Sequence, residues 1–406
     1  MIIYLILAWR NLWRNTHRTV ITVSSIFFAV ILVLFTRSMQ LGTYEHVIFS
    51  TLSVYTGFIQ LHGKGYWDER SLENSMPLTD SLMNQVTNFE HVTAAVPRIE
   101  TFALASSGNI TRGVTVTGID PFKENQMSRL SEKLIKGDFI QPGSMRVLIA
   151  KGLAERLELS PGDSLILLTQ GYHSTSAAGL YLVCGIVDLP VPELNESMVY
   201  MALDDAQYFL SMQGRVTSVA VMIDDPDNLY AVESKMKDSF AQQYEVMNWR
   251  EMVPELVQYI EVDNAGGIIM LGILYVVIGF GIFGTVMMMT EERKREFAIL
   301  LAVGMKKFRI QLMILLETAM IGLLGVICGI IFSIPLLLFM RAHPIQLKGN
   351  AAAAMLEYGF EPVIPFLVEP SLFVDQVIAV FLISAIVSIY PLWTVSRLKI
   401  SKTLHA

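Results

Sequence analysis

The sequence predicts an α+β membrane protein with four transmembrane helices and a large α+β domain between the first and the second. Of its 406 residues, 53% are hydrophobic and only 17% are charged, which is too apolar for an ordinary soluble protein. Four stretches are long and apolar enough to cross a bilayer, and a long stretch of mixed polarity separates the first two. The net charge of −7 excludes the basic surface that nucleic-acid binding normally requires.

The chain opens with a basic segment. Residues 1–18 carry Trp9 and Trp13 among several arginines, which predicts a cytoplasmic interfacial amphipathic helix with aromatic anchors. Residues 19–42 form the first predicted span, with its basic end inside. We expect this span to be retained, because the basic region is too long for a signal peptide and no small-residue cleavage site follows.

Residues 43–263 contain no apolar run that could cross a bilayer, and their length can support a core of its own. Because the first span starts inside, this domain is expected outside the cytoplasm. Its local pattern alternates between strand and helix, with a turn signal at Pro161. The expected elements are strands at 112–120, 146–150 and 164–169 and a helix at 152–159.

The remainder of the chain alternates between apolar runs and basic or polar connections. The second span should measure about 39 Å at 1.5 Å per residue, so we expect it to tilt or to project as a stalk. All segments assigned to the inside are basic, which places both termini in the cytoplasm. The expected segments are span two at 264–290, a cytoplasmic coupling helix at 291–311, span three at 312–340, an outside loop at 341–372, span four at 373–395 and a cytoplasmic tail at 396–406.

The charged connection between the second and third spans has an ordered apolar face. Phe297 and Leu301 recur at helical spacing beside Ala298 and Ala302, and Gly304 is placed to end the helix. The basic residues alone would suit any cytoplasmic loop. The apolar face requires a surface against which to bury, either lipid headgroups or a partner protein.

Three stretches resemble a known family. The segment EERKREFAILLAVGMKKFRIQLMILLE at residues 291–317 resembles the cytoplasmic coupling helix of MacB/FtsX-type (type VII) ABC transporter permeases, which include the LolC/LolE-like proteins of lipoprotein transport. AWRNLWRNTHRT at residues 8–19 resembles their entry helix. VLIAKGLAERLELSPGDSLILL at residues 147–168 resembles their periplasmic core domain. With the later pieces of that domain, the resemblance covers nearly the whole chain.

The resemblance implies a permease of the bacterial inner membrane, surrounded by membrane lipids, with its large domain in the periplasm. It implies an ABC ATPase partner and a second permease, identical or paralogous, paired through the first and second spans. It also assigns the ATPase-coupling residues, with Phe297, Ala298, Leu301 and Gly304 as docking surface and Arg293 and Arg295 as polar contacts. The full set is Arg293, Arg295, Glu296, Phe297, Ala298, Leu301, Ala302, Gly304 and Glu317.

The function implied by the resemblance is mechanotransmission, in which ATP hydrolysis by the partner performs mechanical work outside the cytoplasm. The first hypothesis is release of lipoproteins, or export of another amphiphile, from the inner membrane to a periplasmic carrier. The alternative is an FtsX-like transducer that regulates an extracytoplasmic partner such as a cell-wall hydrolase. In LolC a proline-containing hairpin grips the carrier. The corresponding residues Gln170–Leu180 of this chain contain no proline, which leaves contact with a carrier open.

No catalytic constellation is readable, so we expect the chain not to be an enzyme by itself. Gly63 and Lys64 lack the remaining residues of a Walker A loop, so ATP and Mg are expected on the partner ATPase and no cofactor in this chain. The histidines lack the spacing of a metal site, and no G-x-S-x-G motif is present. GFGIFG at 279–284 matches a dinucleotide fingerprint, but no strand precedes it, and close helix packing explains its glycines better.

Glu317 allows two interpretations, because a carboxylate near the end of a span is costly unless it is paired or reaches water. It could extend to the interface as a solvated residue. It could equally form an ion pair with a basic residue of the coupling segment or of the ATPase.

Overall fold

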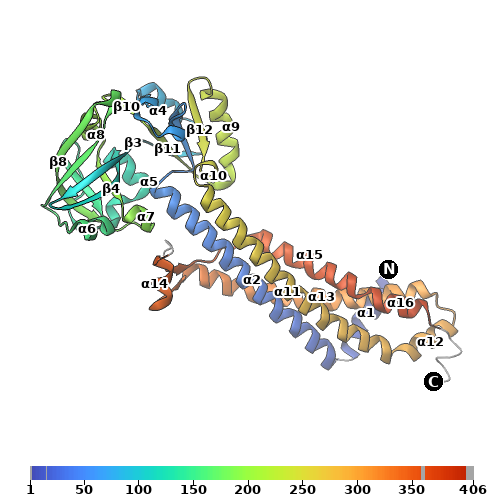
Figure 1. Cartoon of the computed structure of the whole chain (residues 1–406). Coiled ribbons are helices and arrows are strands. Elements are labelled where there is room, and N and C mark those ends of the chain that lie inside the picture. The colour runs from blue at the N-terminus through green and yellow to red at the C-terminus, as the bar shows by residue number, and fades with distance from the viewer. Residues whose placement is uncertain (1, 15, 358–361, 399–406) are drawn as a thin grey trace. The chain divides into compact units, whose positions relative to one another are not determined.

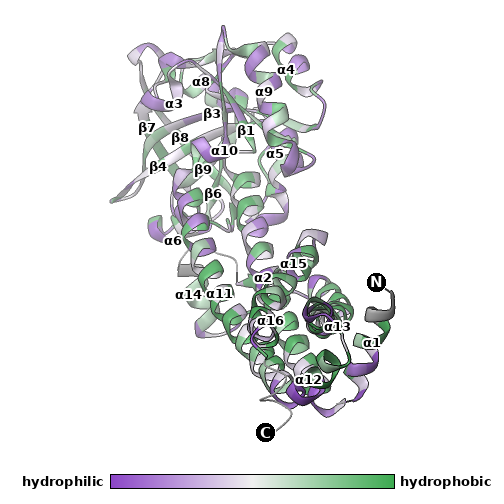
Figure 2. Ribbon diagram, turned by 90° about the vertical axis from the view of Figure 1, so that its right-hand side faces the viewer, coloured by the Kyte–Doolittle hydropathy of each residue, from purple (hydrophilic) through white to green (hydrophobic). Residues whose placement is uncertain are grey.

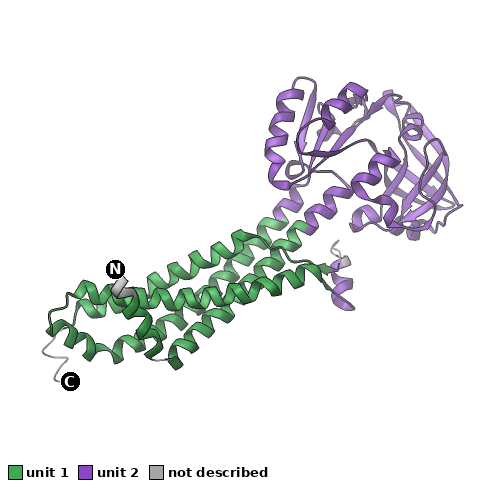
Figure 3. Ribbon diagram, turned by 180° about the vertical axis from the view of Figure 1, so that it is seen from behind, with its two compact units in different colours: residues 1–45, 259–346, 363–406 green, residues 46–258, 347–362 purple. Residues whose placement is uncertain are grey.

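The computed structural model describes residues 2–14, 16–357 and 362–398. It divides into two compact units (Figure 3). The helical unit comprises residues 1–45, 259–346 and 363–406, and the α+β unit comprises residues 46–258 and 347–362. Residues 399–406 of the expected cytoplasmic tail lie outside the described residues, as do residues 1 and 15 of the entry segment.

Among the described residues, four helical stretches are long and apolar enough to cross a membrane. Their apolar colouring contrasts with the mixed polarity of the α+β unit (Figure 2). A short helix, α1 (Ile2–Arg14), precedes them, and another, α12 (Lys294–Ala302), connects the second to the third (Figure 1). The four stretches are α2 (Thr16–Val54), α11 (Pro254–Glu292), α13 (Lys307–Ala342) and α15 (Pro370–Val387) continued by α16 (Ile389–Ser396).

Two of these helices run well beyond the apolar stretches that define them. Helix α2 continues past residue 42 to Val54, and α11 begins at Pro254, before residue 264. The added turns are more polar, but no glycine or proline interrupts them after Thr43 or between Glu255 and Ala265, so the backbone hydrogen bonds continue. The hydropathy of the sequence therefore identifies the apolar part of each helix that is long enough to cross a membrane. It does not identify the residue at which the helix begins or ends.

Close helix packing involves the glycines of α13. A Cβ atom added to Gly325 would lie 2.6 Å from the side chain of Ile26, and one added to Gly329 would lie 2.8 Å from Val30. These glycines let α13 approach α2 closely. The glycines at 279–284 of α11 were also expected to serve close helix packing. Within this chain that expectation is wrong for Gly281 and Gly284, which face open space. Gly266 and Gly272 of the same helix also face open space, because α11 is the least covered of the span helices.

The described part of the α+β unit is built on a ten-stranded sheet with the order β12-β1-β11-β3-β4-β9-β6-β8-β5. Strand β7 pairs with both β3 and β8, so β3, β4, β9, β6, β8 and β7 close into a ring. The strands are β1 (Ile59–Gly63), β3 (Val92–Ser107), β4 (Ile110–Ile119), β5 (Leu134–Gly137), β6 (Arg146–Ala150), β7 (Ser164–Gln170), β8 (Ser176–Val187), β9 (Met198–Ala202), β11 (Ser218–Ile223) and β12 (Tyr244–Asn248).

The strands and the helix expected at 112–120, 146–150, 152–159 and 164–169 are confirmed by β4, β6, α6 and β7. Smaller pairs, β2 (Met76–Pro77) with β10 (Arg215–Val216) and β13 (Ile345–Gln346) with β14 (Val363–Ile364), stand apart from the large sheet. The helices are α3 (Tyr66–Glu69), α4 (Asp80–Thr87), α5 (Pro121–Ser128), α6 (Lys151–Leu157), α7 (Pro192–Asn195), α8 (Leu203–Phe209), α9 (Leu229–Phe240), α10 (Trp249–Met252) and α14 (Asn350–Glu357).

Candidate functional site

The candidate site is helix α12 and the helix ends around it, all within the helical unit. The helix ends as expected at Gly304, whose φ of +95° is in the left-handed region that favours glycine. The amide of Met305 donates to the carbonyl of Leu300 (3.0 Å), and the amide of Gly304 donates to that of Leu301 (3.1 Å). This pair of bonds is a Schellman motif, so the chain turns sharply before α13 begins at Lys307.

One face of α12 is buried inside the chain. Phe297 is 1% exposed and Ala298 is fully buried, and both pack against side chains of α13 and of the segment at the end of α16. The expectation that these two side chains form a docking surface is therefore wrong. The apolar face that requires burial is covered by the protein's own helices: it packs against Ile310, Met313, Ile314, Val395 and Leu398.

A second stripe of α12 remains exposed. Arg295, Ile299, Ala302 and Val303 are spaced at i, i+4, i+7 and i+8, which places them along one side of a helix. Ile299 is 49% exposed and Val303 is 82% exposed. Phe308, in the first turn of α13, is also exposed. We call Arg295, Ile299, Ala302 and Val303 the exposed stripe.

Arg293 lies inward and ties α12 to α13. Its Nη1 atom donates to Oε2 of Glu317 at 2.7 Å, and the two side chains are 9% and 5% exposed. The Arg293 guanidinium also lies 5.2 Å from the centre of the Phe297 ring. Of the two interpretations of Glu317, the ion pair with the coupling segment is confirmed and the solvated residue is wrong. Arg293, expected as a polar contact to the ATPase, is instead buried against Glu317.

Two further ion pairs join this region to the helices at the start of the chain. Glu296 accepts two hydrogen bonds of 2.8 Å from Arg14 of α1. Partial burial would raise the pKa of Glu296, but Arg14 and Arg293 outweigh that effect and lower the pKa. Arg18 of α2 pairs with Glu292 at the end of α11. Arg14, Glu296, Arg293 and Glu317 therefore form one chain of ion pairs from α1 through α12 to α13, and a separate pair joins α2 to α11.

The fourth span stretch joins the same region through hydrogen bonds. The hydroxyl of Tyr390 in α16 donates to Glu291 (3.1 Å). Lys307 donates to the carbonyl of Ser396 (2.6 Å), and Gln311 donates to that of Leu392 (2.9 Å). The fourth span stretch is therefore bonded to both α11 and α13 at this end of the helical unit.

The structure separates the predicted site residues into an inner and an outer group. Arg293, Phe297, Ala298 and Glu317 are buried, and Leu301 packs partly against them. Glu296 pairs with Arg14 at the surface, and Arg295, Ala302 and Gly304 are exposed.

Sequence reasoning missed Ile299 and Val303. Their spacing from Arg295 marks a second apolar stripe, but nothing in the sequence indicates which of the two stripes is exposed. It also missed Arg14 and Arg18 as partners, since contacts so distant along the chain leave no local signal.

The arrangement offers a contact surface and a relay, not a reactive centre. Among the residues that the structure describes, no group of three or more His, Cys, Asp or Glu side chains could hold a metal ion. Residues 279–284, which match the dinucleotide fingerprint, lie within helix α11, so the strand and turn of a nucleotide site are missing there.

Comparisons with known proteins match almost the whole chain. The family model "MacB-like periplasmic core domain" matches residues 19–239, and the model "FtsX-like permease C-terminal" matches residues 268–400. A solved structure of the periplasmic region of MacB from Actinobacillus actinomycetemcomitans covers 51% of this chain and 95% of its own, with 15% identity and a TM-score of 0.36.

Two curated relatives represent two arrangements of the family. The lipoprotein-releasing system transmembrane protein LolC of Xylella fastidiosa is 25% identical over 247 residues, which is 59% of each chain. The macrolide export ATP-binding/permease protein MacB of a Shewanella species is 24% identical over 341 residues, 78% of this chain and 50% of that protein. The chain thus matches about three fifths of the LolC relative's length and half of the MacB relative's length.

Proposed function

The chain belongs to the family of permeases that combine a MacB-like periplasmic core domain with an FtsX-like C-terminal region, and we propose that it is the membrane subunit of an ABC exporter driven by a partner ATPase. The observation that carries this proposal is the exposed stripe on α12. Its apolar residues are held outward by a helix whose other face is already buried. Exposed apolar side chains on a rigid, short helix between two spans suit a protein partner.

The ATPase is proposed as the partner because relatives of this chain combine a permease part like it with an ATP-binding part: the macrolide export ATP-binding/permease protein MacB of a Shewanella species matches this chain over half of its own length. In this proposal the membrane is the bacterial inner membrane, both termini and α12 face the cytoplasm, and the α+β domain faces the periplasm. The basic residues beside the spans support that orientation.

The relay follows from the contacts of α12. Movement of the docked ATPase displaces the exposed stripe, and the Arg293–Glu317 pair passes the displacement to α13. The pairs Arg14–Glu296 and Arg18–Glu292 pass it to α1, α2 and α11. Since α2 and α11 continue into the α+β unit, their motion reaches that domain along two continuous helices. Mechanical work then occurs outside without any chemistry in this chain.

A second permease would complete the membrane part. Helix α11 is the least covered of the span stretches, with only 11% of its apolar window buried. Four of its glycines face open space, where a helix of another copy or a paralogue could approach closely. We propose pairing through α2 and α11, as the family resemblance implies.

The proposed cargo is a lipoprotein or another amphiphile of the inner membrane. The test is reconstitution of the chain with its ABC ATPase in liposomes that carry a fluorescent lipid-anchored protein, with a soluble acceptor outside. We expect ATP-dependent transfer to the acceptor, and none when the catalytic carboxylate of the ATPase is replaced. ATP hydrolysis that activates a cell-wall hydrolase without transfer would favour the FtsX-like transducer. Transfer without ATP would contradict the proposal.

A further inference from the structure

The ring of strands in the α+β unit has an apolar outer face. Along β3 the side chains alternate, with Ala103 and Ala105 buried on the inner side and Phe102 and Leu104 exposed on the outer side. Strands β7 and β8 show the same alternation. The six exposed side chains, which we call the outer apolar face, are Phe102, Leu104, Ile166, Leu168, Leu180 and Leu182.

The six side chains are contiguous because their strands are neighbours. Leu104 pairs with Leu168 across β3 and β7, and Ile166 pairs with Leu180 across β7 and β8. Paired residues of antiparallel strands point to the same side. Phe102 and Leu180 are 76% and 66% exposed, values typical of solvent-facing polar residues. A contiguous exposed apolar patch on a folded domain is a mark of a binding surface.

Among its described residues, the face carries a single charge at its edge, that of Arg146 of β6, which is exposed and pairs with Leu182 of β8. The exposed Gln170 also lies on this side, at the end of β7. The other positions on β3, β4, β7 and β8 beside the six apolar side chains hold small or hydroxyl side chains. These positions are Ser106, Thr111, Gly113, Thr115, Ser164 and Ala178.

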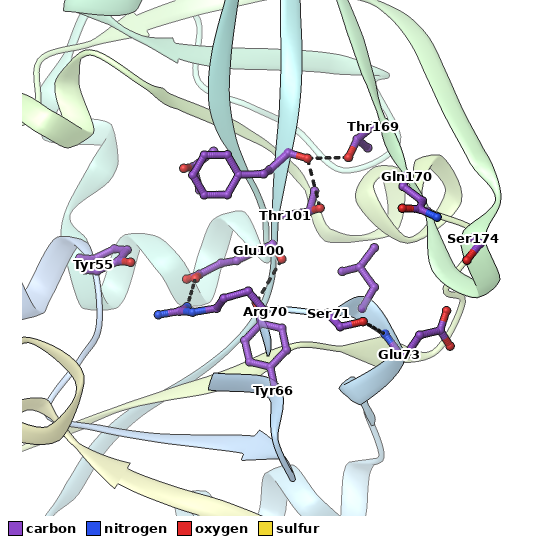
Figure 4. A pocket seen from close by; sticks show the side chains of 14 residues that line it. Tyr55, Tyr66, Arg70, Ser71, Glu73, Glu100, Thr101, Thr169, Gln170 and Ser174 are labelled. Carbon is purple, nitrogen blue, oxygen red and sulfur yellow. Dashed lines mark hydrogen bonds and ion pairs between the residues drawn. The ribbon is translucent and has the colours of Figure 1, made fainter. Parts of the chain in front are cut away.

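A polar pocket continues this face at Phe102. The pocket has a volume of about 450 Å³ and lies between the outer side of β3, the segment 66–73 and the turn that joins β7 to β8 (Figure 4). The turn is held in place, because the amide of His173 donates to Glu73 at 2.6 Å. Tyr55, Tyr66, Phe102 and Thr115 are among the lining residues.

A loosely paired cation and anion face one another in the pocket. Nη1 of Arg70 lies 3.9 Å from Oε2 of Glu100, which is too long for a hydrogen bond. The Glu100 side chain is 9% exposed, and among the described residues no hydrogen bond reaches its carboxylate. The Arg70 guanidinium is held 3.5 Å from the centre of the Trp67 ring. Each charged group therefore retains capacity for a ligand group of opposite charge.

We propose that the pocket and the outer apolar face together bind a zwitterionic amphiphile, with its cationic group at Glu100, its anionic group at Arg70 and its apolar chain along β3, β7 and β8. This proposal rests on the proposed export function. It names the class of substrate that the exporter would carry and a binding site for that substrate outside the membrane. An amphiphile fits both halves of the surface, because an apolar face with a single charge at its edge adjoins a pocket that holds both charges. A protein partner would explain the face but not the charged pair inside the pocket.

The charged carboxylate of Glu100 is expected to make the folded domain less stable than a neutral side chain at this position would. Such a loss of stability is common for residues that serve binding. Burial raises the pKa of Glu100 above its ordinary value. The positive charges of Arg98 and Arg70 oppose this rise of the pKa without cancelling it, and the negative charge of Glu124 adds to it. The domain is therefore more stable with Glu100 neutral, and this advantage is lost as the pH rises through the raised pKa. We therefore expect Glu100→Gln to raise the apparent Tm of the full chain near pH 7. The gain should vanish below the ordinary carboxyl pKa of about 4.3. A lower Tm near pH 7 would show that the carboxylate is structural.

The binding test uses the full chain with the photoreactive residue p-benzoylphenylalanine in place of Leu168. The probe is dodecylphosphocholine, compared with dodecyl maltoside, which has the same chain and an uncharged head. Illumination should attach the zwitterion to the protein with a yield on the order of tenfold higher than the maltoside. The same photoreactive residue at Tyr208, an exposed position on α8, should show no such preference.

Labelling by the zwitterion should fall on the order of tenfold in Arg70→Gln and Glu100→Gln variants. If the Glu100→Gln variant has a raised Tm, unfolding of that variant cannot explain a loss of labelling. Equal labelling by both probes, or a protein adduct at Leu168 in native membranes without any lipid adduct, would overturn the proposal. The assay needs neither ATP nor the ATPase, so binding without ATP-dependent transfer would leave this site intact while contradicting the export function.

Discussion

Replacing Ile299 and Val303 together by aspartate is expected to abolish retention of the ABC ATPase while the permease itself folds normally. Ile299 is 49% exposed and Val303 is 82% exposed, so the substitutions remove little internal packing of the chain. At the centre of an interface, two buried charges without partners should weaken binding at least about a hundredfold. The measurement is the amount of ATPase that co-purifies with the tagged chain at matched expression.

The matched control places the same substitutions at Phe122 and Tyr230, two exposed side chains of the α+β unit. This variant should retain the ATPase like the wild type. A second comparison is Phe297→Asp, which buries a charge and should lower expression of the chain itself. Normal retention by the Ile299 and Val303 variant would show that the exposed stripe is not the docking surface.

Removal of Arg293 from the buried Arg293–Glu317 pair should cost about 3–5 kcal/mol, because the carboxylate of Glu317 stays buried without its ion-pair partner. We expect Arg293→Ala to lower the apparent Tm of the detergent-solubilised chain strongly, and Glu317→Ala to lower it less, because Arg293 keeps Glu296 as a partner at 3.3 Å. The matched control is Arg14→Ala. Its pair with Glu296 is about half exposed and should contribute only about 0–1 kcal/mol.

The double variant Arg293→Met, Glu317→Leu distinguishes a role of the ion pair in the stability of the fold from a role in coupling α12 to α13 during transport. Apolar side chains of similar size often replace a buried ion pair without loss of stability, so the Tm should recover. ATP-driven transfer should remain defective, because α12 is no longer joined to α13 by a directional contact. Full recovery of transfer together with the Tm would show that the pair only stabilises the fold.

The number and order of the spans were predictable because length and hydropathy decide them. The ends of α2 and α11 were not, because a helix continues through polar residues when no glycine or proline interrupts it. The end of α12 was predictable at Gly304, where a left-handed backbone conformation requires a residue without a Cβ atom.

Which face of α12 is buried could not be read from the sequence. The stripe of Phe297 and Ala298 and the stripe of Ile299 and Val303 are both apolar, and only the position of α13 and α16 decides between them. The sequence left open whether Glu317 is solvated or forms an ion pair. The pair with Arg293 could not be predicted, because it depends on how two separate helices pack. The pocket at Arg70 and Glu100 was missed for the same reason: its lining comes from segments far apart in the chain.

The most direct test of the docking surface is photo-crosslinking from Val303 in membranes of the native organism. With p-benzoylphenylalanine at Val303, we expect one major protein adduct, identified by mass spectrometry as an ABC ATPase with a Walker A loop. The same residue at Phe339, an exposed position near the other end of α13, should not give that adduct. If Val303 yields lipid adducts alone, or the ATPase is captured from Phe339 instead, α12 is not the ATPase docking element.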